Sequence, residues 1–236
     1  MRRVNASNQR RHRVKLRHWT SDLFGQIHWD ALKLCISTMP ERRALGCDVL
    51  TAPGRKWLRG PRGSGLLYVR RAFLEAHEPA LLDHFSAPLT ADGYELRNDA
   101  RRFETAEVSV AVRLGLCAAL RYALALGVDR IHARVSSLAE RVRDRFGRVT
   151  GVTLQDTGRN KSALVTFTLA GHRAMDVREK LAKQRIDVVA NGVAFTPLDF
   201  RSRGLQNVVR ISPHVYNTET EIDRVVEAIV CIAAGQ

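Results

Sequence analysis

Lys56 is the residue of this sequence whose type and setting most clearly suggest chemistry. It stands in a segment rich in glycine and proline, residues 52–65, beside Arg55, Trp57 and Arg59. Because nearby cations disfavour the charged form of a lysine, such an amine suits Schiff-base formation with a carbonyl. The plainer interpretation is an exposed lysine in a loop between two strands. The segment has neither G-x-x-x-x-G-K-[ST] nor G-x-G-x-x-G spacing, so it predicts no nucleotide-binding loop.

The cysteines and histidines predict no metal site. Cys35, Cys47, Cys117 and Cys231 are far apart, with no C-x-x-C pair and no histidine at ligand spacing. Cys117 and Cys231 lie in apolar helical patterns and are expected to be core thiols. This usage favours a reducing, cytoplasmic compartment. Among the histidines, His214 is a weak candidate for a substrate pocket.

Composition places the chain among ordinary globular proteins. Its 236 residues are 45% hydrophobic and 26% charged, and no run approaches the ~18 apolar residues of a membrane-spanning helix. Lysine and arginine number 38 against 24 acidic residues, for a net charge of +14. Residues 1–18 hold seven of these cations and no acid, so residues 1–38 are predicted to be a basic, divergent or disordered segment. Such an arm can bind nucleic acid, but no binding motif accompanies it, and that partner is not expected.

The elements that must position Lys56 begin with a predicted hairpin. Residues 48–51 and 66–69 are short apolar runs on either side of the Gly/Pro-rich segment. A helix is predicted from Thr105, as N-cap, to Gly127. Its expected buried face carries Ala111, Leu114, Ala118, Tyr122 and Ala125. A second helix is predicted after Asp129, with a buried stripe of Ile131, Val135, Leu138, Val142 and Phe146.

From residue 147 the pattern alternates between strands and helices. Strands are predicted at residues 152–154, 164–169, 186–190 and 208–211, with helices at 174–183 and after Thr218. Thr218 and Glu221 form a capping box, and the final helix buries Ile222, Val225, Val226 and Ile229. This alternation predicts an α/β architecture. We expect one domain over residues 39–146 and a small α/β domain over residues 147–236.

Three segments follow one another along the chain. The first, residues 48–69, contains the string Arg-Lys-Trp-Leu-Arg-Gly-Pro-Arg-Gly. The second is Arg-Phe-Glu-Thr-Ala-Glu at residues 102–107, and the third is Val-Arg-Ile-Ser-Pro-His-Val-Tyr-Asn-Thr at residues 209–218. Together, and in this order, they resemble class V aminotransferases. The resemblance spans roughly residues 39–232. In its residue pattern around Lys56, the chain most resembles the isopenicillin N epimerase-like and ergothioneine-pathway C–S lyase branches of the family.

The resemblance implies a fold, a cofactor and a set of site residues. The fold is the C-terminal part of a fold type I transferase dependent on pyridoxal phosphate: part of the large-domain sheet plus the small α/β domain. Lys56 resembles the lysine that forms the Schiff base with the cofactor, and Arg55 occupies a position that touches its phosphate. Thr105 resembles a residue that reaches the phosphate of the partner subunit's cofactor, which implies a homodimer. Arg210 resembles the arginine that binds the substrate's α-carboxylate.

The implied function is transamination, epimerisation or C–S lyase chemistry on an amino-acid substrate, in the cytoplasm. Two departures support an alternative, a truncated and inactive family remnant that folds or dimerises without turnover. Pro53 stands where relatives place a hydroxyl donor to the phosphate, and the family's N-terminal half has no match here. Residues 190–204, where cysteine desulfurases carry a catalytic cysteine, contain none, so persulfide chemistry is not expected.

Overall fold

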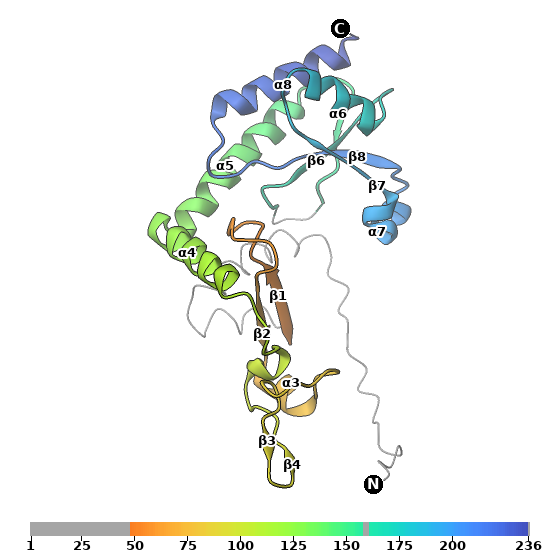
Figure 1. Ribbon diagram of the computed structural model, residues 1–236. Helices are drawn as coiled ribbons and strands as arrows, with labels where there is room; N and C mark the ends of the chain where they lie inside the picture. Colours follow the sequence, from red (N-terminus) through yellow and green to blue (C-terminus); the bar gives the residue numbers. More distant parts are fainter. Residues whose placement is uncertain (1–47, 158–160, 236) are drawn as a thin grey trace.

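The computed structural model describes residues 48–157 and 161–235, so the basic segment predicted at residues 1–38 lies outside the described residues. Figure 1 shows two regions stacked along the long axis of the molecule. A sheet with three helices forms one end, and a hairpin with short irregular elements forms the other. Helices α4 (Val110–Leu126) and α5 (Val128–Phe146) join the two.

The predicted hairpin is confirmed. Strands β1 (Val49–Pro53) and β2 (Gly65–Val69) pair antiparallel, with Pro53 opposite Gly65 at the loop end. Neither strand has another neighbour among the described residues. The hairpin is followed by α3 (Arg71–Ala76), a second small hairpin of β3 (Leu89–Thr90) and β4 (Gly93–Tyr94), and the 3₁₀ turn η1 (Ala100–Phe103).

The predicted α/β region is confirmed as a four-stranded antiparallel sheet in the order β5-β6-β8-β7. Its strands are β5 (Val152–Leu154), β6 (Val165–Leu169), β8 (Asn207–Ile211) and β7 (Val189–Gly192). Helices α5 and α6 (Ala174–Lys183) pack against it, and α8 (Glu219–Ala233) packs against both of these helices. The 3₁₀ turn η2 (Val193–Phe195) leads into α7 (Pro197–Ser202). Strand β7 begins three residues later than predicted. The reason is that the chain forms a turn directly after α6. In this turn, Ile186 N–H donates to Leu181 O and Arg185 has a φ of 60°.

The core lies between this sheet and its helices. The predicted stripe of α5 is confirmed, since all five of its residues are buried, and Phe146 meets Phe167 edge-on at 4.7 Å between ring centroids. The capping box of Thr218 and Glu221 is also confirmed, and the four predicted residues of α8 are buried. Alternate residues of β6 face the core, so Thr166 and Thr168 point to the opposite face of the sheet.

Helix α4 differs from its prediction in both its start and its buried face. Its N-cap is Ser109, whose Oγ accepts a hydrogen bond from Val112 N–H, so Thr105 lies outside the helix. The expected buried face is exposed, with Leu114 65% and Tyr122 51% accessible. Because α4 is apolar around almost its whole circumference, with Arg113 and Arg121 as its charged residues, periodicity does not select the packed face. Its packed side carries Leu116, Leu120 and Ala123.

The two cysteines of the helices differ in burial. Cys117 is half-buried but Cys231 is exposed, so Cys231 is not the core thiol expected, because its position on α8 falls outside the buried stripe.

Within the described ranges, no single helix is long and apolar enough to cross a membrane. Helices α4 and α5 together meet that length and composition, but they bend by 78° where they join.

Candidate functional site

The loop that carries Lys56 is a closed turn between β1 and β2. In this lysine loop, residues 54–60, Gly60 N–H donates to Gly54 O at 2.8 Å and Arg59 N–H donates to Lys56 O at 3.0 Å. Gly54 is buried, and a Cβ there would lie 2.5 Å from Ser64 Oγ and 2.8 Å from Leu116 Cδ1, so the backbone packs closely against its surroundings. Lys56 itself is exposed on the turn. The loop therefore presents a solvent-accessible amine on a tightly held backbone.

Aromatic rings join the lysine loop to the segment that follows β8. Trp57 stacks on His214 with 5.2 Å between ring centroids, and His214 stacks on Tyr216 at 4.8 Å. Arg59 lies over the ring of Tyr122, on α4, at 4.8 Å and near that of Tyr216 at 5.9 Å. Three parts of the chain far apart in sequence thus meet next to Lys56. From the sequence, His214 was predicted only as a weak candidate for a substrate pocket, although a tryptophan beside the lysine was a signal of packing at this place.

The imidazole of His214 is held in its neutral form. Its Nδ1 accepts a hydrogen bond from Val215 N–H at 2.8 Å, which leaves the proton of the neutral ring on Nε2. Burial lowers the pKa of His214 below its ordinary value, the positive charge of Arg59 lowers it further, and the Trp57 backbone acts in the opposite direction. The ring is therefore an uncharged stacking partner at neutral pH.

Arg210 lines a pocket of about 340 Å³ on the face of the sheet opposite the core helices. It pairs with Thr166 across β8 and β6, and Thr166 also lines the pocket. The other lining residues come from β7, β8, η2, α7 and the adjoining turns: Gln155, Asn191, Phe195, Thr196, Asp199, Phe200, Arg203, Leu205 and Val208. The Nε of Arg210 is buried and has no hydrogen-bond partner in the described part of the chain. A buried guanidinium N–H without a partner favours an anionic ligand such as a carboxylate.

The four residues singled out in the sequence are brought together only in part. Arg55 and Lys56 share the lysine loop, and both are exposed. Arg210 lies four residues before His214, which contacts that loop through Trp57. Thr105 is exposed, with its hydroxyl 3.5 Å from Glu107 O, and among residues 48–157 and 161–235 no hydrogen bond or ring contact joins it to the lysine loop. Its expected place at a helix N-terminus is wrong, because α4 begins at Val110.

The motifs and the α/β region agree with a comparison against protein families. The model of the family described as aminotransferase class-V matches residues 25–225, which is most of the chain. This chain belongs to the class-V aminotransferase family.

Relatives of this class-V aminotransferase chain are named for sulfur chemistry. A probable hercynylcysteine sulfoxide lyase of Mycobacterium tuberculosis is 35% identical over 81% of this chain and 46% of its own length. A probable cysteine desulfurase of Mycolicibacterium paratuberculosis is 34% identical over 81% of this chain and 28% of its own. The cysteine desulfurase of Thermococcus onnurineus superposes with a TM-score of 0.73 at 27% identity, covering 82% of this chain and 49% of that one. The chain thus spans about half the length, or less, of the relatives it matches, consistent with part of a fold type I domain.

The family indicates pyridoxal phosphate as the cofactor, and residues of the described site suit it. Lys56 offers an exposed primary amine for the aldehyde, and Arg55 next to it offers a guanidinium for the phosphate. Pro53, at the end of β1, offers no backbone N–H. Clusters of three or more histidine, cysteine or acidic side chains that could hold a metal are absent from the described residues.

Proposed function

We propose that this chain carries the lysine and substrate-arginine part of a pyridoxal-phosphate-dependent active site that acts on an amino acid. The observation that carries the proposal is the packing of the lysine loop, through Trp57, against His214, four residues after Arg210. Through this contact, the loop that carries the amine of Lys56 lies next to the segment that follows the carboxylate-binding cation, Arg210. Since the chain matches about half the length of its relatives, the proposal concerns the residues it contains.

Each residue has a separate task in this proposal. Arg210 binds the α-carboxylate of the substrate and so orients the bond that reacts. Arg55 would hold the phosphate of the cofactor, while the amine of Lys56 would anchor the cofactor and move a proton at the substrate carbon. When bound, pyridoxal phosphate supplies the electron sink that stabilises negative charge on that carbon. Thr105 would reach the cofactor of a second copy in a homodimer.

Cleavage of a carbon–sulfur bond is the reaction we favour over transamination or epimerisation. Two relatives above 30% identity are named as a sulfoxide lyase and a desulfurase. The segment from β7 through α7, which lines the Arg210 pocket, contains no cysteine that could accept sulfur as a persulfide. The proposal is therefore a lyase that releases sulfur without a protein thiol, with cytoplasmic location as a further expectation.

Borohydride trapping tests the role of Lys56. The purified chain is incubated with pyridoxal phosphate and reduced, and the modified peptide is mapped by mass spectrometry. We expect one label per chain at Lys56, lost in Lys56→Ala and retained in Lys180→Ala, which removes an exposed lysine on α6. Scattered labelling of many lysines below one per chain would show that the cofactor has no defined site.

Such scattered labelling would favour the second candidate, an inactive remnant of the family. The specific observation behind that candidate is Pro53, which cannot donate to a phosphate. The two candidates also differ after mixing with cysteine derivatives, because the enzyme would release sulfur-containing product and the remnant would not.

A further inference from the structure

We propose that His214 is a positioning residue for Lys56, which holds the lysine loop against the segment following Arg210 and releases it when the imidazole is protonated. The device consists of Trp57, Arg59, Tyr122, His214 and Tyr216, and we call it the histidine clamp. The inference rests on the proposed function only where it assigns the cofactor to Lys56. The clamp itself is argued from contacts within the chain.

The lysine loop needs a support outside its own hairpin. Strands β1 and β2 form a two-stranded sheet with no further strand beside them in the described ranges, and such a hairpin alone is marginally stable. Leu58 anchors the loop in the apolar core, where it is 5% exposed. Trp57 is the residue next to Lys56 in the chain, so the position of its ring fixes the backbone from which the lysine side chain extends.

His214 is held on its edge as well as on its faces. Its ring lies between those of Trp57 and Tyr216, with interplanar angles of 26° and 15°. The backbone around it is closed by Asn217, whose Oδ1 accepts from His214 N–H at 2.8 Å and whose own N–H donates to His214 O at 2.9 Å. Because Val215 N–H donates to Nδ1, the ring has one preferred orientation. A phenylalanine could stack here but could not accept that hydrogen bond.

The clamp is suited to the neutral imidazole. Protonation would place a hydrogen on Nδ1 facing the Val215 N–H, so that two donors would oppose each other. It would also add a positive charge near Arg59, the charged group of the lysine loop that acts on His214, while the ring that stacks on His214 from the following turn is that of Tyr216. From α4, Tyr122 contacts Arg59 rather than the imidazole. Burial and Arg59 both lower the pKa of His214 from 6.5, so the contact is complete above pH 6.5 and is lost as the pH falls through the lowered value.

The fluorescence of Trp57 reports the clamp without any cofactor. In a Trp19→Phe/Trp29→Phe background, Trp57 is the remaining tryptophan, and its emission changes when the His214 ring leaves it and the indole becomes exposed to water. We expect the emission to titrate with a midpoint below pH 6.5, and to become flat between pH 5 and 8 in His214→Phe. The matched control is His77→Phe, which alters a histidine stacked on Phe73 at 3.9 Å and should leave the titration unchanged. A flat profile in the parent would overturn the proposal.

Trapping at Lys56 then links the clamp to the lysine. We expect labelling by pyridoxal phosphate and borohydride at pH 8 to slow about tenfold in His214→Ala, which removes the stack, and less in His214→Phe, which keeps it. Equal labelling rates in His214→Ala and the parent would overturn the positioning role. If the fluorescence titrates as expected while Lys56 is labelled at no pH, the clamp stands and the proposed function fails. Circular dichroism of each variant separates these results from unfolding.

Discussion

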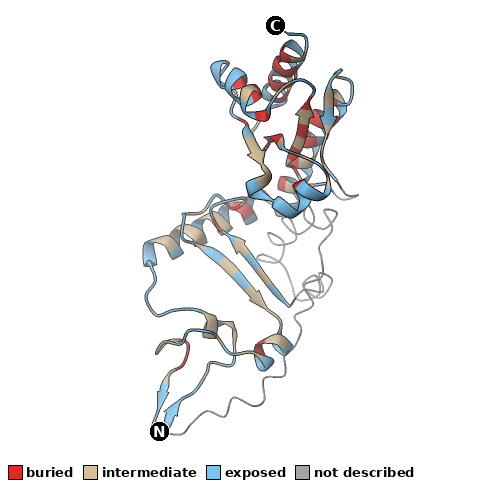
Figure 2. Cartoon of the chain, turned by 90° about the vertical axis from the view of Figure 1, so that its right-hand side faces the viewer, coloured by how far each residue is buried: buried red, intermediate tan, exposed pale blue. Residues whose placement is uncertain are grey.

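Residues 128–235 and residues 48–109 are held together in different ways. The first region buries a continuous set of apolar side chains between a four-stranded sheet and three helices. In the second region, the buried apolar side chains are Leu58, Leu74 and Ala87. Figure 2 shows the contrast, with buried residues concentrated at the end that holds the four-stranded sheet and mostly intermediate or exposed residues along the hairpins. The two regions differ in how much of their stability comes from burial.

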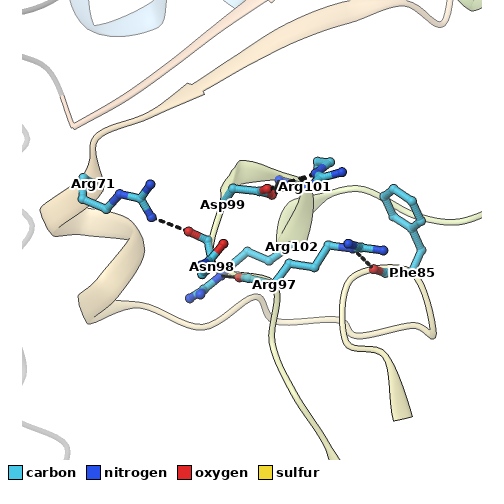
Figure 3. A network of polar contacts seen from close by, with 7 residues as sticks. All are labelled: Arg71, Phe85, Arg97, Asn98, Asp99, Arg101 and Arg102. Carbon is cyan, nitrogen blue, oxygen red and sulfur yellow. Dashed lines mark hydrogen bonds and ion pairs between the residues drawn. The ribbon is translucent and has the colours of Figure 1, made fainter. Parts of the chain in front are cut away.

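Arginine side chains take the place of a core in residues 71–107. Figure 3 shows Arg97 donating to Phe85 O, Arg71 donating to Asn98 O and Arg102 donating to Arg97 O. Asp83 joins this part of the chain to the segment before α4, since its carboxylate accepts from Ala106 N–H at 2.7 Å. Hydrogen bonds of this kind fix irregular backbone but contribute less free energy than apolar burial over the same length. The sheet region is therefore stabilised by its own core, whereas the lysine hairpin depends on contacts at its edges.

The largest effect is expected from breaking a buried ion pair inside the sheet region. Arg143 and Asp156 form an ion pair at 2.8 Å with side chains 9% and 7% exposed, and Asp156 also accepts from Thr166. Asp156→Asn leaves a buried guanidinium without its counter-charge, so we expect a loss of about 3–5 kcal/mol in the free energy of unfolding. Urea titration followed by circular dichroism measures it. Asp176→Asn, in the exposed pair with Arg173, is the control and should lower the free energy of unfolding much less. Equal losses would contradict the contrast between buried and exposed pairs.

Hydrogen exchange tests the comparison across whole strands. We expect the amides that bond β6, β8 and β7 to exchange at least ~100-fold more slowly than those that bond β1 to β2, because the hairpin opens without unfolding the core. Mass spectrometry of exchanged peptides resolves the two sets. Similar protection in both would mean that the regions unfold as one unit and that the hairpin is better supported than its burial indicates.

The sequence predicted the sheet region more fully than the hairpin region for a physical reason. Helix α5 has a charged side opposite its apolar stripe, so its buried residues follow from periodicity alone. Helix α4 lacks such a side, and the face predicted to be buried is exposed. Its start was also predicted too early, because Thr105 is a residue type that favours the N-cap position, whereas the side chain that caps the helix is that of Ser109. The contacts of Ala106 with Asp83, and of Glu104 with Arg113, hold residues 104–106 outside the helix.

The sequence predicted which residues belong to the candidate site, but it did not predict the contacts that bring them together. Lys56, Arg55 and Arg210 were identified from motifs that relate this chain to its family. The stacking of Trp57 on His214 joins residues 157 positions apart, and no local pattern specifies such a contact. The burial of Arg143 could not be predicted either, since charged residues usually lie at the surface. Its partner, Asp156, follows 13 residues later and outside α5, so no local pattern pairs the two.

A smaller effect is expected from the arginine network of the hairpin region. Arg102 donates to Arg97 O at 2.6 Å and to Leu74 O at 2.9 Å, whereas the exposed Arg101 pairs with Asp99. Arg102→Met removes both backbone contacts, and we expect local opening to become easier by about 1–2 kcal/mol, or cleavage by a protease to become roughly tenfold faster. Limited proteolysis with mapping of cuts in residues 71–103 measures this. Arg101→Met is the matched control, and an equal acceleration there would assign the effect to charge rather than to the backbone contacts.

The smallest effect concerns an exposed ion network on the sheet region and its dependence on pH. Arg141 and Arg145 of α5 both bind the carboxylate of Asp223 on α8, at 2.8 and 2.5 Å, and lower its pKa from 3.8 to about 2. A carboxylate whose pKa is lower in the folded state stabilises the fold above pH 3.8, and this contribution is lost as the pH falls toward 2. Asp223→Asn should therefore lower the unfolding temperature slightly at pH 5 and by much less near pH 2. Added salt should reduce the difference at pH 5, since the pair is exposed to screening. Glu227→Gln, which removes an exposed carboxylate from the same helix, is the matched control and should change the unfolding temperature at pH 5 by less than Asp223→Asn does. A difference between Asp223→Asn and the parent that was as large at pH 2 as at pH 5 would mean that α5 and α8 are joined there by packing rather than by charge.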